Sequence, residues 1–207
     1  MKLDKSINVM IPAAGKSSRM GKAKLLLPWG STTVIGHIIK VFSSTRINEI
    51  YVVIDSNHIE LNNQLEILSE EYPIKIISGP GLHEKDMRYS IQIGLETTKN
   101  FSDAILISLG DQPQIQPETV KKILSVYREK EPGIIVPSFN MRRGHPWLLN
   151  NQLFDEFLML EPPSSPREFL KTNQEIIHYV EVDNDSILQD IDTPLDYLNF
   201  LPMEDND

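Results

Sequence analysis

Four basic residues lie close together near the start of the chain, in a segment that carries no acid. Lys16, Arg19, Lys22 and Lys24 fall within nine residues, and no Asp or Glu occurs from residue 5 to residue 48, although the net charge of the chain is -9. Small residues and two glycines surround them, which leaves backbone N–H groups available to bond an anion. The pattern predicts a phosphate-binding loop, and a solvated basic loop is the alternative.

A carboxylate follows a second strand pattern. Residues 104–109 form a nearly continuous apolar run, which predicts a strand buried on both faces, and Gly110 and Asp111 come directly after it. Ligands of open α/β sheets gather at the carboxyl ends of the strands. Asp111 is therefore a candidate functional carboxylate, and a plain Gly-Asp-Gln-Pro turn is the alternative.

Strand and helix patterns alternate along the chain, which predicts an α/β fold with a mostly parallel sheet and flanking helices. Strands are expected at residues 9–11, 50–54, 74–77, 104–109, 133–136 and 176–182. Helices are expected around residues 34–42, 61–68, 90–98, 117–127, 152–160, 166–171 and 194–200. Without an internal repeat or a linker, residues 1–207 are predicted to form one domain, with a frayed acidic tail at residues 202–207.

Composition excludes several classes of protein. The absence of cysteine rules out disulfides, thiolate metal sites and Cys nucleophiles, so any metal must be held by Asp, Glu, His or phosphate oxygens. The N-terminal residues lack an apolar signal region, and no apolar run reaches the roughly 18 residues of a membrane helix. A cytoplasmic protein without a membrane partner is expected. The net acidity argues against nucleic acid as a partner.

The basic segment is specific enough to resemble a known family. Residues 13–28 read A-A-G-K-S-S-R-M-G-K-A-K-L-L-L-P, which is neither of the common phosphate loops G-x-x-x-x-G-K-[ST] and G-x-G-x-x-G. The segment resembles A-A-G-x-x-x-R-M-G-x-x-K-x-L-L-P, the signature loop of the molybdenum cofactor nucleotidyltransferases, in particular their cytidylyltransferase branch. The resemblance covers nearly the whole chain and implies a Rossmann-like sheet of the nucleotide-diphospho-sugar transferase (GT-A) type.

The resemblance implies nucleotidyl transfer, which needs a stabilised pyrophosphate leaving group. Arg19 and Lys24 match the family's arginine and lysine and would pair with the triphosphate. Asp111 matches the aspartate that holds Mg²⁺ in the family, and these three residues are the predicted catalytic groups. The predicted nucleotide-binding residues are Pro12, Ala13, Ala14, Gly15, Lys16, Ser17, Ser18, Arg19, Met20, Gly21, Lys24, Ser90 and Gly110.

A second metal ligand is expected near the C-terminus, where residues 190–196 resemble the family's D-I-D-T-P-x-D. Alternation in an extended segment puts Asp190 and Asp192 on one side, so both could face the metal. Alternatively, Asp192 or Thr193 caps the helix that opens at Pro194. The favoured interpretation is that one of the two aspartates is a ligand and the other a cap, without an assignment between them.

The acceptor side is predicted from residues 142–146, which resemble the family's R-R-G-H-P. Guanidinium groups beside a glycine suit the phosphate of an attacking pterin, and a histidine there would orient it. The predicted acceptor-binding residues are Gln112, Pro113, Arg143, Gly144 and His145. A structural histidine and a solvated Arg142 are the alternatives.

Two segments depart from the family pattern. Asp86 replaces the glycine of G-M-x-x-S at residues 86–90, and Ser164-Ser165-Pro166-Arg167-Glu168 replaces the beginning of G-D-x-G-A-R. The acceptor pocket is therefore expected to differ from the usual one. Ala13-Ala14, in place of the Gly-Gly of guanylyltransferases, leaves less room for a purine and favours CTP over GTP by ~1–3 kcal/mol.

The sequence thus predicts a Mg²⁺-dependent cytidylyltransferase that joins CMP from CTP to the phosphate of the molybdenum-pterin cofactor and releases pyrophosphate. A molybdenum hydroxylase apo-enzyme is a candidate partner. Two alternatives stay open. One is nucleotidyl transfer to another phosphate or sugar phosphate, and the other is a non-catalytic escort that carries the cofactor to an apo-enzyme.

Overall fold

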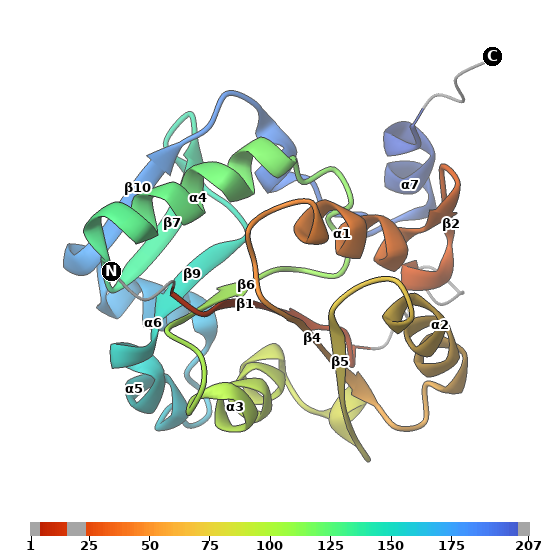
Figure 1. Cartoon of the computed structure of the whole chain (residues 1–207), viewed down its shortest axis with the longest axis horizontal. Coiled ribbons are helices and arrows are strands. Elements are labelled where there is room, and N and C mark those ends of the chain that lie inside the picture. Colours follow the sequence, from red (N-terminus) through yellow and green to blue (C-terminus); the bar gives the residue numbers. More distant parts are fainter. Residues whose placement is uncertain (1–4, 16–23, 203–207) are drawn as a thin grey trace.

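A computed structural model describes residues 5–15 and 24–202, and every structural statement below refers to them. The central sheet runs in the order β10-β7-β9-β6-β1-β4-β5 (Figure 1). Its strands are β1 (Ile7–Pro12), β4 (Ile50–Asp55), β5 (Ile74–Gly79), β6 (Ala104–Ile107), β7 (Ile134–Phe139), β9 (Trp147–Asn150) and β10 (Ile177–Glu181). Two short hairpin strands, β2 (Pro28–Trp29) and β3 (Thr32–Thr33), pair with each other, and β8 (Arg142–Arg143) pairs with β7.

The sheet is mostly parallel, as predicted. β1 pairs in parallel with β4 and β6, β4 pairs in parallel with β5, and β7 pairs in parallel with β10. β9 is the exception, because it runs antiparallel between β6 and β7. Its four residues are all buried and show no alternation, which is why no strand was predicted there.

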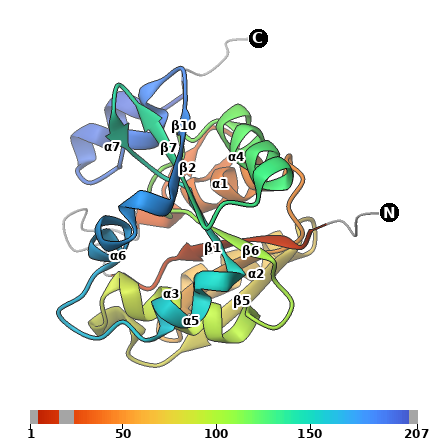
Figure 2. The same cartoon turned by 90° about the vertical axis from the view of Figure 1, so that its left-hand side faces the viewer.

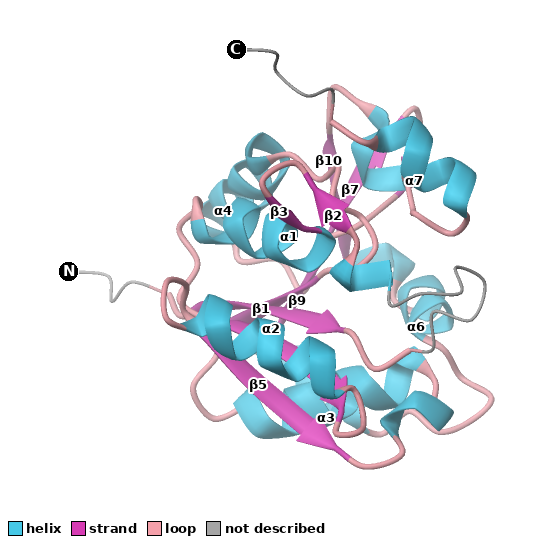
Figure 3. Ribbon diagram, turned by 90° about the vertical axis from the view of Figure 1, so that its right-hand side faces the viewer, coloured by secondary structure: helices cyan, strands magenta, loops and turns pink. Residues whose placement is uncertain are grey.

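Helices cover both faces of the sheet (Figures 1 and 3). Apolar residues of α1 (Val34–Ser43), α2 (Ile59–Ser69) and α4 (Pro117–Lys130) form one core with one face. Apolar residues of α3 (Met87–Thr98), α5 (Phe154–Leu158) and α6 (Pro166–Thr172) form a second core with the other face. Residues of β1 alternate between the two cores, since Val9 and Ile11 belong to the first and Met10 to the second.

Local signals account for most helix starts. The Thr33 side chain accepts a hydrogen bond from the Gly36 N–H at the start of α1, and Pro117 occupies the first turn of α4. α3 lies close to β1 at Gly94, where a Cβ atom would overlap the end of the Met10 side chain. The last helix, α7 (Pro194–Phe200), has the bounds that the sequence predicted.

Short 3₁₀ helices connect these elements: η1 (Lys24–Leu26), η2 (Leu82–Glu84), η3 (Asn151–Leu153), η4 (Gln174–Ile176) and η5 (Asp185–Leu188). Residues 203–207 of the predicted acidic tail lie outside the described residues. In the described part of the chain, no helix has both the length and the apolar character that crossing a membrane requires.

Candidate active site

The carboxyl ends of β1 and β6 border a cavity of about 240 Å³. The two strands are parallel neighbours, so the chain leaves both at the same edge of the sheet. Residues that follow β1 supply backbone groups, and residues that follow β6 supply Asp111. The cavity is lined by Pro12, Ala13, Ala14, Gly15, Lys24, Leu25, Lys85, Asp86, Met87, Ser90, Leu109, Gly110 and Asp111.

The structure therefore gathers around this cavity all seven of the described residues that the sequence predicts to bind nucleotide. Ser90 and Gly110 face the same cavity as the residues after β1. The remaining predicted residues, Lys16, Ser17, Ser18, Arg19, Met20 and Gly21, lie outside the described residues. The roles assigned to them, including the catalytic role of Arg19, stay predictions.

Lys24 joins two carboxylates that are distant in the sequence. Its Nζ lies 2.7 Å from an Asp111 oxygen and 3.4 Å from an Asp192 oxygen, and its side chain is only 13% exposed. One ammonium group between two carboxylates offsets their mutual repulsion in a partly desolvated place. The fold thus brings the predicted lysine and two predicted aspartates to one point beside the cavity.

Asp190 and Asp192 flank a buried residue and contact different partners. Ile191 between them is fully buried, and its N–H donates to the Asp111 carbonyl oxygen over 2.9 Å. The Gln112 side-chain amide donates a hydrogen bond to Asp190. Burial and, less strongly, the negative charges of Asp111 and Asp192 raise the pKa of Asp190, while the bond from Gln112 opposes this. Gln112 therefore anchors Asp190, whereas Lys24 is shared by Asp111 and Asp192.

The cap of α7 differs from the favoured expectation. The Thr193 hydroxyl accepts a hydrogen bond from the Asp196 N–H over 3.2 Å, and the Asp196 carboxylate accepts one from the Thr193 N–H over 2.8 Å. This capping box completes the helix start without Asp190 or Asp192. The expectation that one of them is the cap is wrong, because the neighbouring threonine takes that position.

These carboxylates fit a divalent metal ion. Among residues 5–15 and 24–202, no three His, Asp or Glu side chains are grouped as a ready metal site. Mg²⁺ needs fewer protein ligands, because it takes one or two carboxylates and completes its shell with phosphate oxygens and water. Asp111 and Asp192 already share one cationic group, so this pair suits a hard cation.

A second cavity, of about 710 Å³, carries three of the five predicted acceptor residues: Arg143, Gly144 and His145. Arg167 of α6 also faces it, and the sequence analysis assigned no role to this residue. The cavity is lined by Met87, Val136, Met141, Arg142, Arg143, Gly144, His145, Trp147, Ser165, Pro166, Arg167 and Leu170. Three arginines and no acidic residue among these described lining residues suit an anionic ligand.

Gln112 and Pro113 do not join this group. Both are buried, and neither contributes to the described lining of the two cavities. Gln112 is occupied by its bond to Asp190. Gln112 therefore positions the Asp190 carboxylate and does not line the second cavity.

Close packing and a backbone hydrogen bond to Ile187 account for Gly144 and His145 at these positions. A Cβ atom on Gly144 would overlap the Ile187 carbonyl oxygen, and the His145 N–H donates to that same oxygen over 3.2 Å. Burial lowers the pKa of His145, and its Nδ1 lies 3.5 Å from the Ile107 carbonyl oxygen. The lowered pKa favours the neutral form of His145.

The two cavities adjoin at the start of α3, because Met87 faces both of them. The mostly parallel α/β sheet presents a lysine and two carboxylates at its carboxyl edge, beside a basic cavity, and this arrangement suits a ligand that carries phosphate groups. The MobA-like NTP transferase domain family matches residues 9–177, and the chain belongs to this family. The protein is therefore a nucleotidyltransferase with cytidylyltransferase-like relatives, which confirms the family expected from the loop after β1.

Relatives of known sequence and structure agree with this assignment. The molybdenum cofactor cytidylyltransferase of Escherichia coli is 28% identical over 194 residues, covering 93% of this chain and 94% of the relative. Rv0371c from Mycobacterium tuberculosis has the same fold, with a TM-score of 0.80 at 23% identity over 96% of this chain and 98% of the neighbour. A manganese complex of Rv0371c is also similar, with a TM-score of 0.76 at 22% identity over 95% and 98% of the two chains.

Proposed function

We propose that this nucleotidyltransferase transfers CMP from CTP to the phosphate of the molybdenum-pterin cofactor, releases pyrophosphate and uses Mg²⁺. The observation that carries the proposal is the position of Lys24 between Asp111 and Asp192, beside the cavity at the ends of β1 and β6. The E. coli relative, which is similar over nearly its whole length, supports the choice of nucleotide and acceptor.

The carboxylates and the lysine have complementary roles in this reaction. Asp111 and Asp192 would hold Mg²⁺, which when bound neutralises charge on the triphosphate and on the leaving pyrophosphate. Lys24 would place its ammonium group on the α-phosphate, where negative charge develops during transfer. Gln112 holds Asp190 beside them and so keeps a further negative charge near the metal ligands.

The residues that line the first cavity favour a pyrimidine base over a purine base. Ala13 and Ala14 are 5% and 2% exposed and line the cavity, so their methyl groups occupy space that glycines would leave open. Methyl groups of this kind shift nucleotide preference by ~1–3 kcal/mol. CTP should therefore be preferred over GTP.

The second cavity suits an acceptor that combines an anionic group with a ring system. Arg142, Arg143 and Arg167 supply positive charge, and Trp147 and Leu170 supply apolar surface. A phosphate nucleophile is already ionised at neutral pH, so the reaction needs no general base. The neutral His145 is compatible with a reaction of this kind.

The test is incubation of the purified protein with Mg²⁺, the molybdenum cofactor and each nucleoside triphosphate in turn. Mass analysis measures the dinucleotide, and a coupled assay measures pyrophosphate. We expect dinucleotide from CTP, little from GTP, and loss of product in Asp111→Asn. Asp183→Asn, which changes an exposed aspartate that pairs with Lys122, is the matched control and should keep full activity.

Each negative result has its own meaning. Tight CTP binding without a dinucleotide would refute the molybdenum cofactor as acceptor and would favour another phosphate or sugar phosphate. Full activity of Asp111→Asn would refute the proposed metal site. Absence of nucleotide binding with retained cofactor binding would favour the escort alternative.

A further inference from the structure

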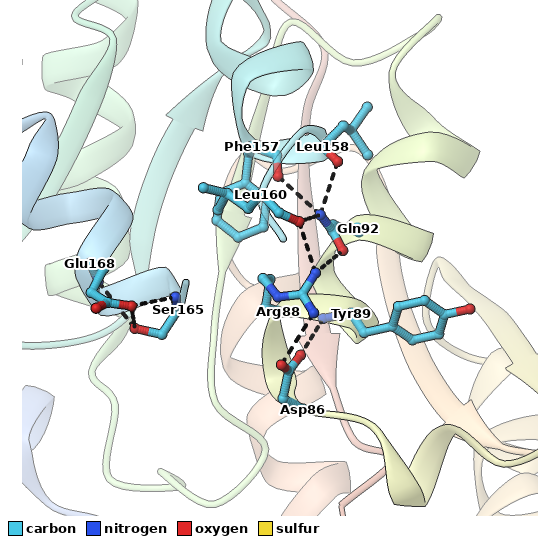
Figure 4. Close-up of polar contacts among 9 residues, drawn as sticks. All are labelled: Asp86, Arg88, Tyr89, Gln92, Phe157, Leu158, Leu160, Ser165 and Glu168. Carbon is cyan, nitrogen blue, oxygen red and sulfur yellow. Dashed lines mark hydrogen bonds and ion pairs between the residues drawn. The ribbon is translucent and has the colours of Figure 1, made fainter. Parts of the chain in front are cut away.

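The start of α3 carries a buried arginine that contacts two other parts of the chain (Figure 4). Arg88 is only 7% exposed. One of its terminal nitrogens donates to the Gln92 side-chain oxygen over 2.7 Å and to the Leu160 carbonyl oxygen over 2.9 Å. The other nitrogen donates to the Asp86 carboxylate over 3.3 Å. A buried charge is costly, so an arginine at this place implies more than the filling of space.

Gln92, one turn further along α3, completes the network. Its amide nitrogen lies 3.2 Å from the Phe157 carbonyl oxygen, 2.9 Å from that of Leu158 and 2.8 Å from that of Leu160. The Phe157 and Leu158 carbonyls lie at the C-terminal end of α5, and Leu160 lies two residues beyond it. Side chains of α3 thus cap the C-terminus of α5, and α5 packs against α3 (Figure 2).

The segment held in this way leads into a wall of the second cavity. After Leu160 the chain runs through five residues to α6, where Ser165, Pro166, Arg167 and Leu170 line the cavity. A capping box between Ser165 and Glu168 fixes the start of α6. The Phe169 ring packs edge-on against the Phe157 ring of α5, with 5.0 Å between the ring centroids. The end of α5 and the start of α6 therefore form one connected structure that rests on Arg88 and Gln92.

The other end of the network lies at the first cavity. Asp86 and Met87 line the first cavity, and Met87 also lines the second. Asp86 is fixed independently, because its carboxylate accepts the Tyr89 N–H over 2.9 Å as the cap of α3. Loss of the Arg88 side chain should therefore increase the mobility of the end of α5 and the start of α6 more than that of Asp86.

We propose that Arg88 and Gln92 are positioning residues that hold the α6 wall of the second cavity at a fixed distance from Met87, and that they thereby set the affinity for the acceptor but not for the nucleotide. The proposal rests on the proposed function, because it takes the second cavity as the acceptor site. The Arg88 side chain contacts Asp86, in one of the two segments that depart from the family pattern. It also contacts Leu160, which leads into the other of these segments, the one that contains Ser165.

The first test is kinetic and compares two variants with a matched control. Arg88→Met and Gln92→Leu remove the donors while keeping side chains of similar length. Lys99→Met removes a cation just after the same helix, where the Lys99 ammonium pairs with the exposed Glu96 carboxylate. We expect KM for the acceptor to rise roughly tenfold in each test variant, as the loss of hydrogen bonds to carbonyl groups would give. KM for CTP and kcat should stay within about twofold, as in Lys99→Met.

A conservative variant separates positioning from general stability. Arg88→Lys keeps the charge and one donor, so it should recover part of the acceptor affinity. Every variant is checked by thermal melting, and Gln92→Leu decides the question if Arg88→Met does not fold, because it removes no buried charge. A rise in both KM values together, or a fall in kcat alone, would overturn the proposal.

The second test does not depend on the identity of the acceptor. Hydrogen exchange followed by mass spectrometry should show faster exchange at residues 158–172 in Arg88→Met and Gln92→Leu, with unchanged exchange in β6. Unchanged exchange at residues 158–172 would overturn the positioning role. If the wild-type protein makes no dinucleotide while the exchange result holds, the proposed function fails and the positioning of the α6 wall stands.

Discussion

Lys24 shows how much of the site depends on a single side chain. It lies within contact distance of Asp111 and Asp192, which are distant in the sequence and would otherwise repel each other. The same ammonium group is the described cation closest to both proposed metal ligands. Its role should therefore be visible both in turnover and in metal binding.

Replacement of Lys24 separates these two roles. We expect Lys24→Met to lower kcat by roughly 10²–10³, as removal of one transition-state donor does elsewhere. In the absence of nucleotide it should bind a divalent cation more tightly than wild type, since two carboxylates lose the cation that they share. Steady-state kinetics and calorimetric titration with Mn²⁺ measure these effects. Lys40→Met, on the exposed surface of α1, is the control, and full turnover in Lys24→Met would refute the assigned role.

Asp55 is a second residue whose contacts extend beyond its own strand. It is fully buried at the end of β4, and it accepts the His83 N–H over 3.0 Å, His83 Nδ1 over 2.7 Å and the Asn57 N–H over 2.8 Å. These hydrogen bonds, the one from the His83 backbone foremost, hold the pKa of Asp55 well below its usual range. Asp55 thus fastens the segment that continues to Lys85 and Asp86 at the first cavity.

The pH dependence of stability tests this contact. Because the pKa of Asp55 is lower in the folded than in the unfolded protein, its contribution to stability is present above the unfolded pKa of about 4 and is lost as the pH falls toward the folded pKa. The difference in the free energy of unfolding between wild type and Asp55→Asn should therefore be largest near pH 7 and shrink below pH ~4. Urea unfolding at several pH values measures it. A difference independent of pH would contradict the ionised contact.

At the scale of elements, the second cavity depends on how closely η5 approaches β8. Gly144 follows β8, and a side chain there would overlap the backbone of Ile187 in η5. The Ile187 carbonyl oxygen also accepts the His145 N–H, so this contact aligns the segment that carries Arg142 and Arg143. The glycine is therefore explained by packing, whether or not it contacts an acceptor.

Substitution of Gly144 should lower the free energy of unfolding more than substitution of Gly15. Gly144→Ala should lower the free energy of unfolding by ~1–3 kcal/mol, because the backbone of η5 must move to admit the methyl group. Gly15→Ala is the matched control for stability, since no atom of the residues that the structure describes lies within 4 Å of its added Cβ. Its free energy of unfolding should stay within about 0.5 kcal/mol of wild type. Equal values for both variants, measured in urea, would contradict the close contact.

At the scale of the whole molecule, two cores share one sheet. Trp29 belongs to the core with α1, α2 and α4, and Trp147 belongs to the core with α3, α5 and α6. β1 contributes side chains to both, so loss of either core would expose one face of the central strand. We therefore propose that the chain unfolds as one domain.

The two tryptophans test that proposal directly, because the chain has only these two. Trp29→Phe leaves a reporter in one core, and Trp147→Phe leaves a reporter in the other. Fluorescence of each variant in urea should give a single transition that coincides with the loss of helical circular dichroism. Separate midpoints for fluorescence and circular dichroism within either variant would indicate two units and contradict the proposal.

Prediction of the fold succeeded where the signal was local. The apolar run before Gly110 and the helical spacing of Val34, Ile38 and Phe42 predicted elements that the structure contains. β9 was missed because its four consecutive buried residues show neither the two-residue period of a half-buried strand nor the 3.6-residue period of a helix. Its antiparallel position between β6 and β7 depends on how the whole sheet assembles. The cap of α7 was misassigned because Thr193 and the aspartates before it are equally suitable residue types.

The sequence by itself determined the alternation of strands and helices, the family, and Lys24, Asp111, Asp190 and Asp192 as candidate site residues, because periodicity and motif spacing are properties of neighbouring positions. Only the tertiary structure decided which carboxylates share Lys24, that Gln112 is tied to Asp190, and that Arg88 and Gln92 hold the end of α5. The physical reason is distance along the chain. Each of these contacts joins residues from separate elements, and their meeting depends on the packing of the complete sheet and its helices.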